Sequence, residues 1–367
     1  MRRRIVRHGG GLAGGALAVL VGLAGVAGCD NPPPPPVDGG SDGSVVPPHD
    51  GGPDTGHDGG ASNPDTGVDA GPRPDTGVDG GVLPTTAPTT FVKQAFGNFR
   101  SPTDAVVSPD GATFYFAAFD TTGRPAIFSM SSTATPGAAT AGPAGAPLEY
   151  PSGLALSCDG ATLYIADPVA GGAGSLFSMS AGGTTAPTAI TTTGLTSPNA
   201  IAMDDDCAHL VVSGRDTAGT PIVARVALAG GAATAITSGA PLVAPTGVYV
   251  DAANSVWVLD WAAESTHGRG VLFHLTPTAA PSVAASGLHL GTPAGVTFPA
   301  GGGRAIVATR DASGAANLTI VDATSGAVTN GAFTGVTVLD PGGLRSARRA
   351  GVFAIVDTEG AAIYRGQ

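Results

Sequence analysis

The stretch from Asp260 to Arg269 holds the densest set of side chains that could do chemistry. It contains Trp261, Glu264 and His267 as well as the terminal arginine, and its indole is one of only two in the chain. An exposed indole beside acidic and basic groups is typical of a binding site, because the ring supplies contact area and the charges set orientation. The alternative interpretation is a solvated loop whose tryptophan lies over the edge of a sheet.

Three further arginines lie in comparable turns and could contact an anionic ligand. They are Arg124, Arg215 and Arg310. Two of them directly precede aspartates, in the dipeptides Arg215-Asp216 and Arg310-Asp311. We favour pairing within these dipeptides over a free anion site, because a neighbouring carboxylate would neutralise each guanidinium.

Other motifs that carry chemistry are absent from the sequence. There is no G-x-S-x-G, H-E-x-x-H, P-loop or C-x-x-C motif. The histidines after residue 88 are His209, His267, His274 and His289. None of these forms an i,i+4 pair that could bind a metal. A net charge of −11 and a single lysine argue against nucleic-acid binding.

A proline and an aspartate recur along the chain every 44 to 51 residues, and we number the six resulting repeats 1 to 6. The prolines are Pro102, Pro151, Pro198, Pro245, Pro293 and Pro341. The aspartates are Asp120, Asp167, Asp216, Asp260, Asp311 and Asp357. Each aspartate ends or follows an apolar run, such as LYIAD or VWVLD. Short apolar and β-branched runs between Gly, Pro and Asp turns predict strands.

Four strands in a unit of this length are typical of a propeller blade. We therefore predict an all-β fold, a six-bladed β-propeller with four-stranded blades, over residues 89–367. The last repeat has only three strands, so a strand near Phe91 is expected to close the last blade and cover both open edges. We call the six recurring prolines and the six recurring aspartates the proline and aspartate columns. Both columns should line one mouth of the propeller, and the aspartates should accept backbone N–H groups and so shape turns.

The two cysteines of this region occupy equivalent positions. Cys158 and Cys207 each lie between the first two strands of repeats 2 and 3. Adjacent blades place these turns side by side, so we predict a disulfide in an oxidising compartment. The alternative is a pair of free buried thiols.

The N-terminus carries the features of an export signal. Residues 1–29 combine a basic start with a short Ala/Gly/Leu/Val stretch and end in V-A-G-C. That ending resembles the lipobox of bacterial lipoproteins, which implies a lipid on Cys29 and membrane contact through this anchor alone. The alternative is an ordinary secretory signal with an incidental cysteine.

Residues 30–88 differ sharply in composition from residues 89–367. They hold a five-proline run and ten aspartates against a single arginine, Arg73. Such a segment has too little apolar surface to offset the entropy of ordering. We predict a disordered linker between the signal and the propeller.

The phrases SPDGATFYFAAFD and SCDGATLYIAD resemble the six-bladed propellers of the SMP-30/gluconolactonase, NHL and YVTN-like group. The resemblance to the lactonases implies a divalent metal, Ca or Zn, held at the hub by Glu, Asn and Asp side chains. Glu149 and Asn199 match the family's glutamate and its P-N-A asparagine. The family's P-D-G aspartate has no counterpart, and Asp340 and Asp104 are the nearby carboxylates that could complete the set.

These observations together favour a binding module over an enzyme. We expect a monomeric, lipid-anchored propeller at the bacterial cell envelope that binds a protein or small molecule at its mouth. It should need no cofactor and bind no nucleic acid. The alternative is an SMP-30/gluconolactonase-like, metal-dependent hydrolase.

Overall fold

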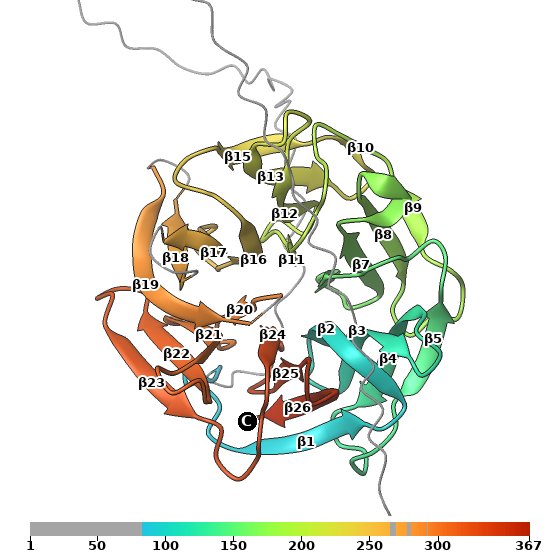
Figure 1. Cartoon of the computed structure of the whole chain (residues 1–367), viewed down its shortest axis with the longest axis vertical. Coiled ribbons are helices and arrows are strands. Elements are labelled where there is room, and N and C mark those ends of the chain that lie inside the picture. The colour runs from blue at the N-terminus through green and yellow to red at the C-terminus, as the bar shows by residue number, and fades with distance from the viewer. Residues whose placement is uncertain (1–82, 265–268, 277–279, 292) are drawn as a thin grey trace, which may run out of the picture. The chain divides into compact units, whose positions relative to one another are not determined.

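The computed structural model of the chain describes residues 83–264, 269–276, 280–291 and 293–367 (Figure 1). The predicted signal with Cys29, almost all of the predicted linker, and His267 lie outside these residues. The described residues form strands and turns, with one short 3-10 turn, η1 (Ala170–Gly172). The predicted all-β character is confirmed. No helix in this part is long and apolar enough to cross a membrane.

Repeats 1 and 2 each form a four-stranded antiparallel sheet with the strands in sequence order. Repeat 1 contains β2 (Phe99–Val107), β3 (Thr113–Asp120), β4 (Pro125–Ser131) and β5 (Thr140–Ala144). Repeat 2 contains β6 (Gly153–Leu156), β7 (Thr162–Asp167), β8 (Ser175–Ser180) and β9 (Thr188–Ile190).

Repeat 3 forms a sheet in the order β11-β12-β13-β15. Its strands are β11 (Ile201–Met203), β12 (His209–Arg215), β13 (Pro221–Ala227) and β15 (Thr234–Ser238). A separate two-stranded parallel pair joins β10 (Thr192–Thr193) to β14 (Gly231–Ala232).

Repeats 4 and 5 share one eight-stranded sheet. Repeat 4 supplies β16 (Pro245–Val250), β17 (Val256–Glu264), β18 (Arg269–Leu275) and β19 (Ser282–Leu290). Repeat 5 supplies β20 (Val296–Thr297), β21 (Arg304–Arg310), β22 (Ala316–Asp322) and β23 (Val328–Ala332). The two halves meet where β19 pairs with β21, through His289 with Arg310 and Leu290 with Thr309.

Repeat 6 pairs with the first strand of the described region. It contains β24 (Pro341–Ser346), β25 (Phe353–Asp357) and β26 (Ala362–Gly366). The fourth strand of this sheet is β1 (Phe91–Phe96), which runs antiparallel to β26 from Phe91 opposite Gly366 to Phe96 opposite Ala362.

The sheets are arranged around a central axis as a β-propeller (Figure 1). Their innermost strands contact one another in the cyclic series β2, β6, β11, β16, β20, β24 and back to β2. Apolar clusters fill the space between neighbouring sheets, for example Phe114 and Phe128 of repeat 1 against Val352 and Ala354 of repeat 6. Burial of each such large side chain stabilises the fold by about 1.5–3 kcal/mol.

A buried ion pair crosses the hub of the propeller. The Arg345 guanidinium on β24 lies 3.6 Å from Asp104 Oδ2 on β2 and is almost entirely buried. The same guanidinium donates to the carbonyls of Val296 at 2.9 Å and Ile201 at 3.3 Å. The Asp104 carboxylate also accepts the Leu154 N–H at 2.9 Å. Side chains of repeats 1 and 6 thus hold backbone of repeats 2, 3 and 5.

Cys158 and Cys207 form the predicted disulfide, with their Cα atoms 5.8 Å apart. Arg348 reaches it from repeat 6, with Nη1 3.3 Å from Cys158 Sγ. We call the end of the sheets that carries this bond, and the turns between the first two strands of each repeat, the disulfide face. The bond links neighbouring repeats 2 and 3 at that face.

Candidate functional site

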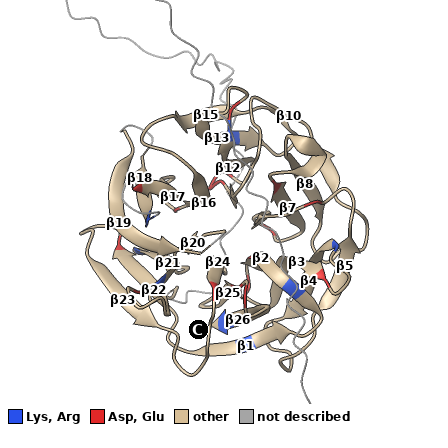
Figure 2. Ribbon diagram, viewed as in Figure 1, with Lys and Arg blue, Asp and Glu red and all other residues tan. Residues whose placement is uncertain are grey.

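The proline and aspartate columns lie at one end of the sheets, which we call the mouth face. Pro245 is the register partner of Asp260, and Pro341 is the partner of Asp357. The antiparallel order of the strands places this end opposite the disulfide face. Acidic and basic residues are interspersed among the blades rather than segregated (Figure 2).

The column aspartates of the odd-numbered repeats shape their own turns. This class consists of Asp120, Asp216 and Asp311, whose carboxylates accept backbone N–H groups two to four residues further along the chain. The hydroxyls of Thr122 and Ser313 and the N–H of Thr220 lower the pKa of these carboxyls below the ordinary range. This agrees with the predicted turn-shaping role.

The column aspartates of the even-numbered repeats do something that the repeat pattern did not predict. This class consists of Asp167, Asp260 and Asp357, whose side chains are fully buried. Each accepts the N–H groups of two residues that precede the proline of its own repeat. The bonds run from Glu149 and Tyr150 to Asp167, from Val243 and Ala244 to Asp260, and from Leu339 and Asp340 to Asp357, at 2.7–3.0 Å.

These buried carboxylates fix three segments of the mouth face. Each segment exposes one large apolar side chain, with Tyr150 39%, Val243 46% and Leu339 45% exposed. A backbone held by two charge-assisted hydrogen bonds loses little further entropy when a partner binds. The mouth face therefore presents fixed apolar groups.

Replacing Asp260 by alanine should lower the free energy of unfolding by about 2–4 kcal/mol, because the N–H groups of Val243, Ala244 and Ala262 lose a buried charged acceptor. Urea denaturation at neutral pH measures this loss. Asp216→Ala is the matched control and should cost less, since its carboxylate serves only its own turn. Equal losses in both variants would contradict the distinction between the two classes.

The stretch around Trp261 lies on the extended end of β17. Trp261 is 46% exposed, and its backbone N–H donates to the Ala244 carbonyl at 3.2 Å. Glu264 Oε2 accepts the Gly287 N–H at 2.7 Å, and Glu264 is the register partner of Arg269. The structure brings these groups onto one hairpin, whose tip with His267 is outside the described residues.

The three predicted arginines have different partners. Arg124 pairs with Asp120 at 2.9 Å, and Arg310 pairs with Asp340 at 2.9 Å. Arg215 donates only to carbonyls within the described part of the chain, those of Gly219 and Val243. The favoured pairing of Arg215 and Arg310 with the aspartates that follow them was wrong, because those carboxylates are turned into their own hairpins.

The residues expected to hold a metal each have another partner. Glu149 Oε1 accepts the Gly171 N–H at 2.9 Å. Asp340 pairs with Arg310, while the Asn199 backbone bonds Ser213 and Ser152. Burial raises the pKa of Asp104, and the nearby Arg345 charge opposes this shift. In the described residues the carboxylates of Glu149, Asp104 and Asp340 do not converge into one ligand group.

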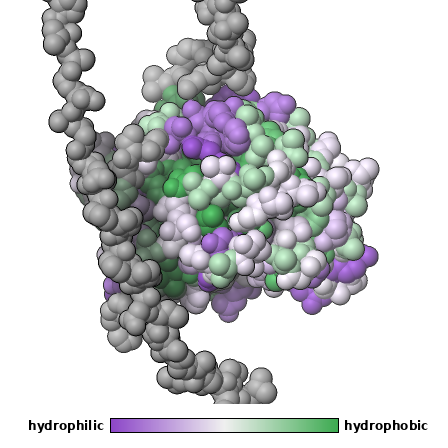
Figure 3. Space-filling view, turned by 90° about the horizontal axis from the view of Figure 1, so that it is seen from above, coloured by the Kyte–Doolittle hydropathy of each residue, from purple (hydrophilic) through white to green (hydrophobic). Residues whose placement is uncertain are grey.

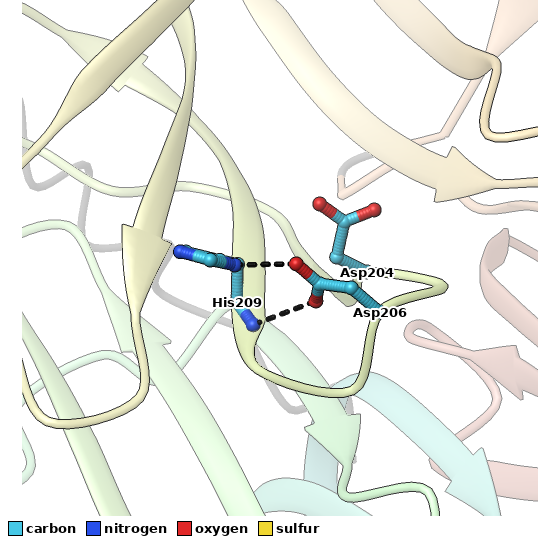
Figure 4. A group of neighbouring side chains, drawn as sticks. All are labelled: Asp204, Asp206 and His209. Atoms are coloured by element: carbon cyan, nitrogen blue, oxygen red, sulfur yellow. Dashed lines mark hydrogen bonds and ion pairs between the residues drawn. The ribbon is translucent and has the colours of Figure 1, made fainter. Parts of the chain in front are cut away.

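A different acidic group comes together at the disulfide face. Asp204, Asp206 and His209 offer ligand atoms within 4.8 Å of one another (Figure 4). However, Asp204 Oδ2 is 2.5 Å from Arg225 Nε, and Asp206 Oδ2 is 2.5 Å from His209 Nδ1. Asp206 also accepts the Ala208 N–H, so these groups stabilise a turn. In the sequence this group corresponds to three consecutive aspartates followed, three residues later, by a histidine.

Solved structures are similar to this chain at low sequence identity. A structural genomics protein of unknown function from Bacteroides thetaiotaomicron is 15% identical over 76% of this chain and 72% of its own, with a TM-score of 0.55. TolB from Acinetobacter baumannii is 14% identical over 72% of this chain and 54% of its own, with a TM-score of 0.48. No protein-family model and no curated relative matches the chain. The β-propeller assignment rests on the arrangement of the sheets, and the sequence comparisons show no family.

Proposed function

We propose that this chain is a lipid-anchored propeller of six four-stranded blades that binds a protein partner at its mouth face, outside the bacterial cytoplasm. The cyclic contacts of the innermost strands support this blade count. So does the pairing of β1 with β26, which gives repeat 6 its fourth strand. On this interpretation the eight-stranded sheet is two blades joined between β19 and β21.

The observation that carries the proposal is where large apolar side chains are exposed. Those at the mouth face are Tyr150, Val169, Val243, Trp261 and Leu339. The remaining ones in the described part lie on the outer strands: Val92, Phe96, Val283 and Val328. Exposed aromatic and aliphatic groups on a fixed backbone are what protein interfaces use as anchors.

The mouth face favours a protein partner, because its exposed apolar side chains come from several repeats, as the anchors of a protein interface do. In a view turned by 90°, apolar and polar groups are interspersed over the visible surface (Figure 3).

The start of the described chain leaves the mouth face free. Pro84 accepts the Gly301 N–H at 2.8 Å and packs near Gly351. Both glycines belong to turns between the first two strands of their repeats, at the disulfide face. The first described residues therefore lie at the disulfide face, at the opposite end of the sheets from the mouth face.

The metal-dependent hydrolase of the SMP-30/gluconolactonase type is not favoured. Its reaction requires ligands that converge on one ion, whereas Glu149 and Asp104 are bonded to separate backbone groups. No described residue set at the mouth supplies a replacement.

Site-specific photo-crosslinking tests the proposal. A benzophenone amino acid at Trp261 of the full chain, expressed in its native cells, should give a discrete adduct that excess unlabelled protein abolishes. The same group at Val328, which is 52% exposed on an outer strand, is the control and should give none. Trp261→Ala protein should compete at least tenfold less well. Equal amounts of adduct at both positions, or equal competition by wild-type and Trp261→Ala protein, would contradict the proposal.

A further inference from the structure

Three equivalent junctions occur at the mouth face, each where an odd-numbered repeat meets the next even-numbered one. At each junction the residue before the column aspartate approaches the segment before the next proline. The equivalent pairs are Phe119 with Tyr150, Arg215 with Ala244, and Arg310 with Asp340. The first is an aromatic contact, with ring centroids 5.8 Å apart. The junctions therefore share a backbone arrangement but differ in chemistry.

At the junction of repeats 5 and 6 the arginine is paired with a carboxylate of the chain. Arg310 Nη1 donates to the carbonyl of Gly314, four residues on, at 3.1 Å. Its Nη2 donates to Asp340 Oδ1 at 2.9 Å. The chain itself supplies the carboxylate that neutralises this guanidinium.

The junction of repeats 3 and 4 holds the same arginine without the carboxylate. Arg215 Nη1 donates to the carbonyl of Gly219, again four residues on, at 2.7 Å. Its Nη2 lies 3.4 Å from the Val243 carbonyl, and the residue equivalent to Asp340 is Ala244. Across the described residues no carboxylate pairs with this exposed guanidinium. Two carbonyls hold it in place and leave its charge uncompensated.

The aspartate next to Arg215 does not fill this role. Asp216 Oδ1 accepts the N–H groups of Ala218 and Thr220, at 2.9 and 2.8 Å. These bonds lower its pKa and turn the carboxylate into its own hairpin. Arg215 is therefore positioned for an anion from outside the described residues.

Two exposed apolar residues are connected to this arginine through hydrogen bonds of the Val243–Ala244 backbone. Val243 and Trp261 are each 46% exposed. They are linked through backbone, because Val243 accepts from Arg215 while the Trp261 N–H donates to Ala244. The buried Asp260 carboxylate fixes the Val243–Ala244 segment by accepting both of its backbone N–H groups. Arg215 and the Trp261 backbone are thus both bonded to the fixed Val243–Ala244 segment, which itself exposes Val243.

We infer that Arg215 binds a side-chain carboxylate of the protein partner, and that an adjacent apolar residue of the partner packs on Val243 and Trp261. The occupant is an exposed peptide segment with Asp or Glu next to a large apolar residue. A guanidinium recognises a carboxylate through paired, charge-assisted hydrogen bonds. The Arg310–Asp340 pair is the intramolecular version of this contact. The inference rests on the proposed function and specifies its partner.

Selection from a random 12-residue peptide library displayed on phage tests the specificity. The full chain should enrich peptides with Asp or Glu beside Leu, Ile, Phe or Trp. Ala244→Asp places a carboxylate where Asp340 lies relative to Arg310, so this variant should lose the acidic enrichment. Ala229→Asp, an exposed position in the β13–β14 turn, adds the same charge away from the mouth and should retain it. Enrichment without acidic residues, or no enrichment, would overturn the inference.

Affinity measurements with a selected, C-terminally amidated peptide test the contact itself. Arg215→Gln should weaken peptide binding at least tenfold. In that variant, replacing the peptide's Asp by Asn should cause no further loss of affinity. Arg304→Gln, an exposed arginine at the start of β21, is the matched control and should bind as the wild type does. Equal binding by Arg215→Gln protein, or recovery of binding when a free C-terminus replaces the Asp, would contradict a side-chain contact. If Trp261 crosslinking persists in that case, the proposed function stands and this inference alone fails.

Discussion

Replacing Arg345 by methionine should lower the free energy of unfolding by about 3–5 kcal/mol, because Asp104 stays buried without its cation. Asp104 and Arg345 are both buried at the hub, and their charged atoms lie 3.6 Å apart. Methionine retains the apolar length of the side chain, so the change removes charge more than volume. Urea denaturation followed by circular dichroism measures the loss.

Two controls distinguish the ion pair from packing. The double variant Asp104→Asn/Arg345→Met should recover much of the stability, since no uncompensated charge remains buried. Burial raises the pKa of Asp104 in the folded protein above the value in the unfolded chain. The contribution of Asp104 to the free energy of unfolding therefore declines as the pH rises through the raised pKa. The Arg345→Met deficit should therefore be smaller near pH 4, about the ordinary pKa of aspartate, than at neutral pH. A deficit independent of pH and unchanged in the double variant would contradict the assignment.

Removing the disulfide should lower the free energy of unfolding by about 4 kcal/mol, as chain-entropy arguments give for a loop of this length. Cys158 and Cys207 are 49 residues apart, so the bond restricts a long segment of the unfolded chain. The double variant Cys158→Ala/Cys207→Ala reports the loss in urea denaturation. Dithiothreitol should destabilise the wild type by a similar amount and leave the variant unchanged. A reductant effect of equal size on the variant would show that another cause is at work.

The two classes of column aspartate explain how a repeated residue can serve different ends. In odd-numbered repeats the carboxylate closes its own turn, as Asp216 does. In even-numbered repeats it is buried and, besides closing its own turn, holds the segment before the proline, as Asp260 does for Val243 and Ala244. The repeated residue is thus structural throughout, while the residues it positions differ between repeats. The proposed binding surface consists of those variable residues.

Local sequence pattern was sufficient for the strands and for the disulfide. Alternating apolar runs between Gly, Pro and Asp turns predicted the all-β propeller, because strand formation depends on neighbouring residues. Cys158 and Cys207 occupy equivalent turns of adjacent repeats, and this equivalence predicted that they lie side by side. The signal and linker predictions concern residues 1–88, almost all outside the described part, and stay predictions.

Only the tertiary structure decided which charges meet. Arg310 was expected to pair with the adjacent Asp311, yet its partner is Asp340, thirty positions along. Asp104 and Arg345 come together across the hub although most of the chain separates them. Asp311 follows the end of β21 and its carboxylate accepts N–H groups of its own turn, so proximity in sequence does not make it the partner of Arg310. The curvature of the sheets around the axis sets those distances, and no run of neighbouring residues encodes it. This is why the strands could be predicted from the sequence, while the free guanidinium of Arg215 could be recognised only in the folded chain.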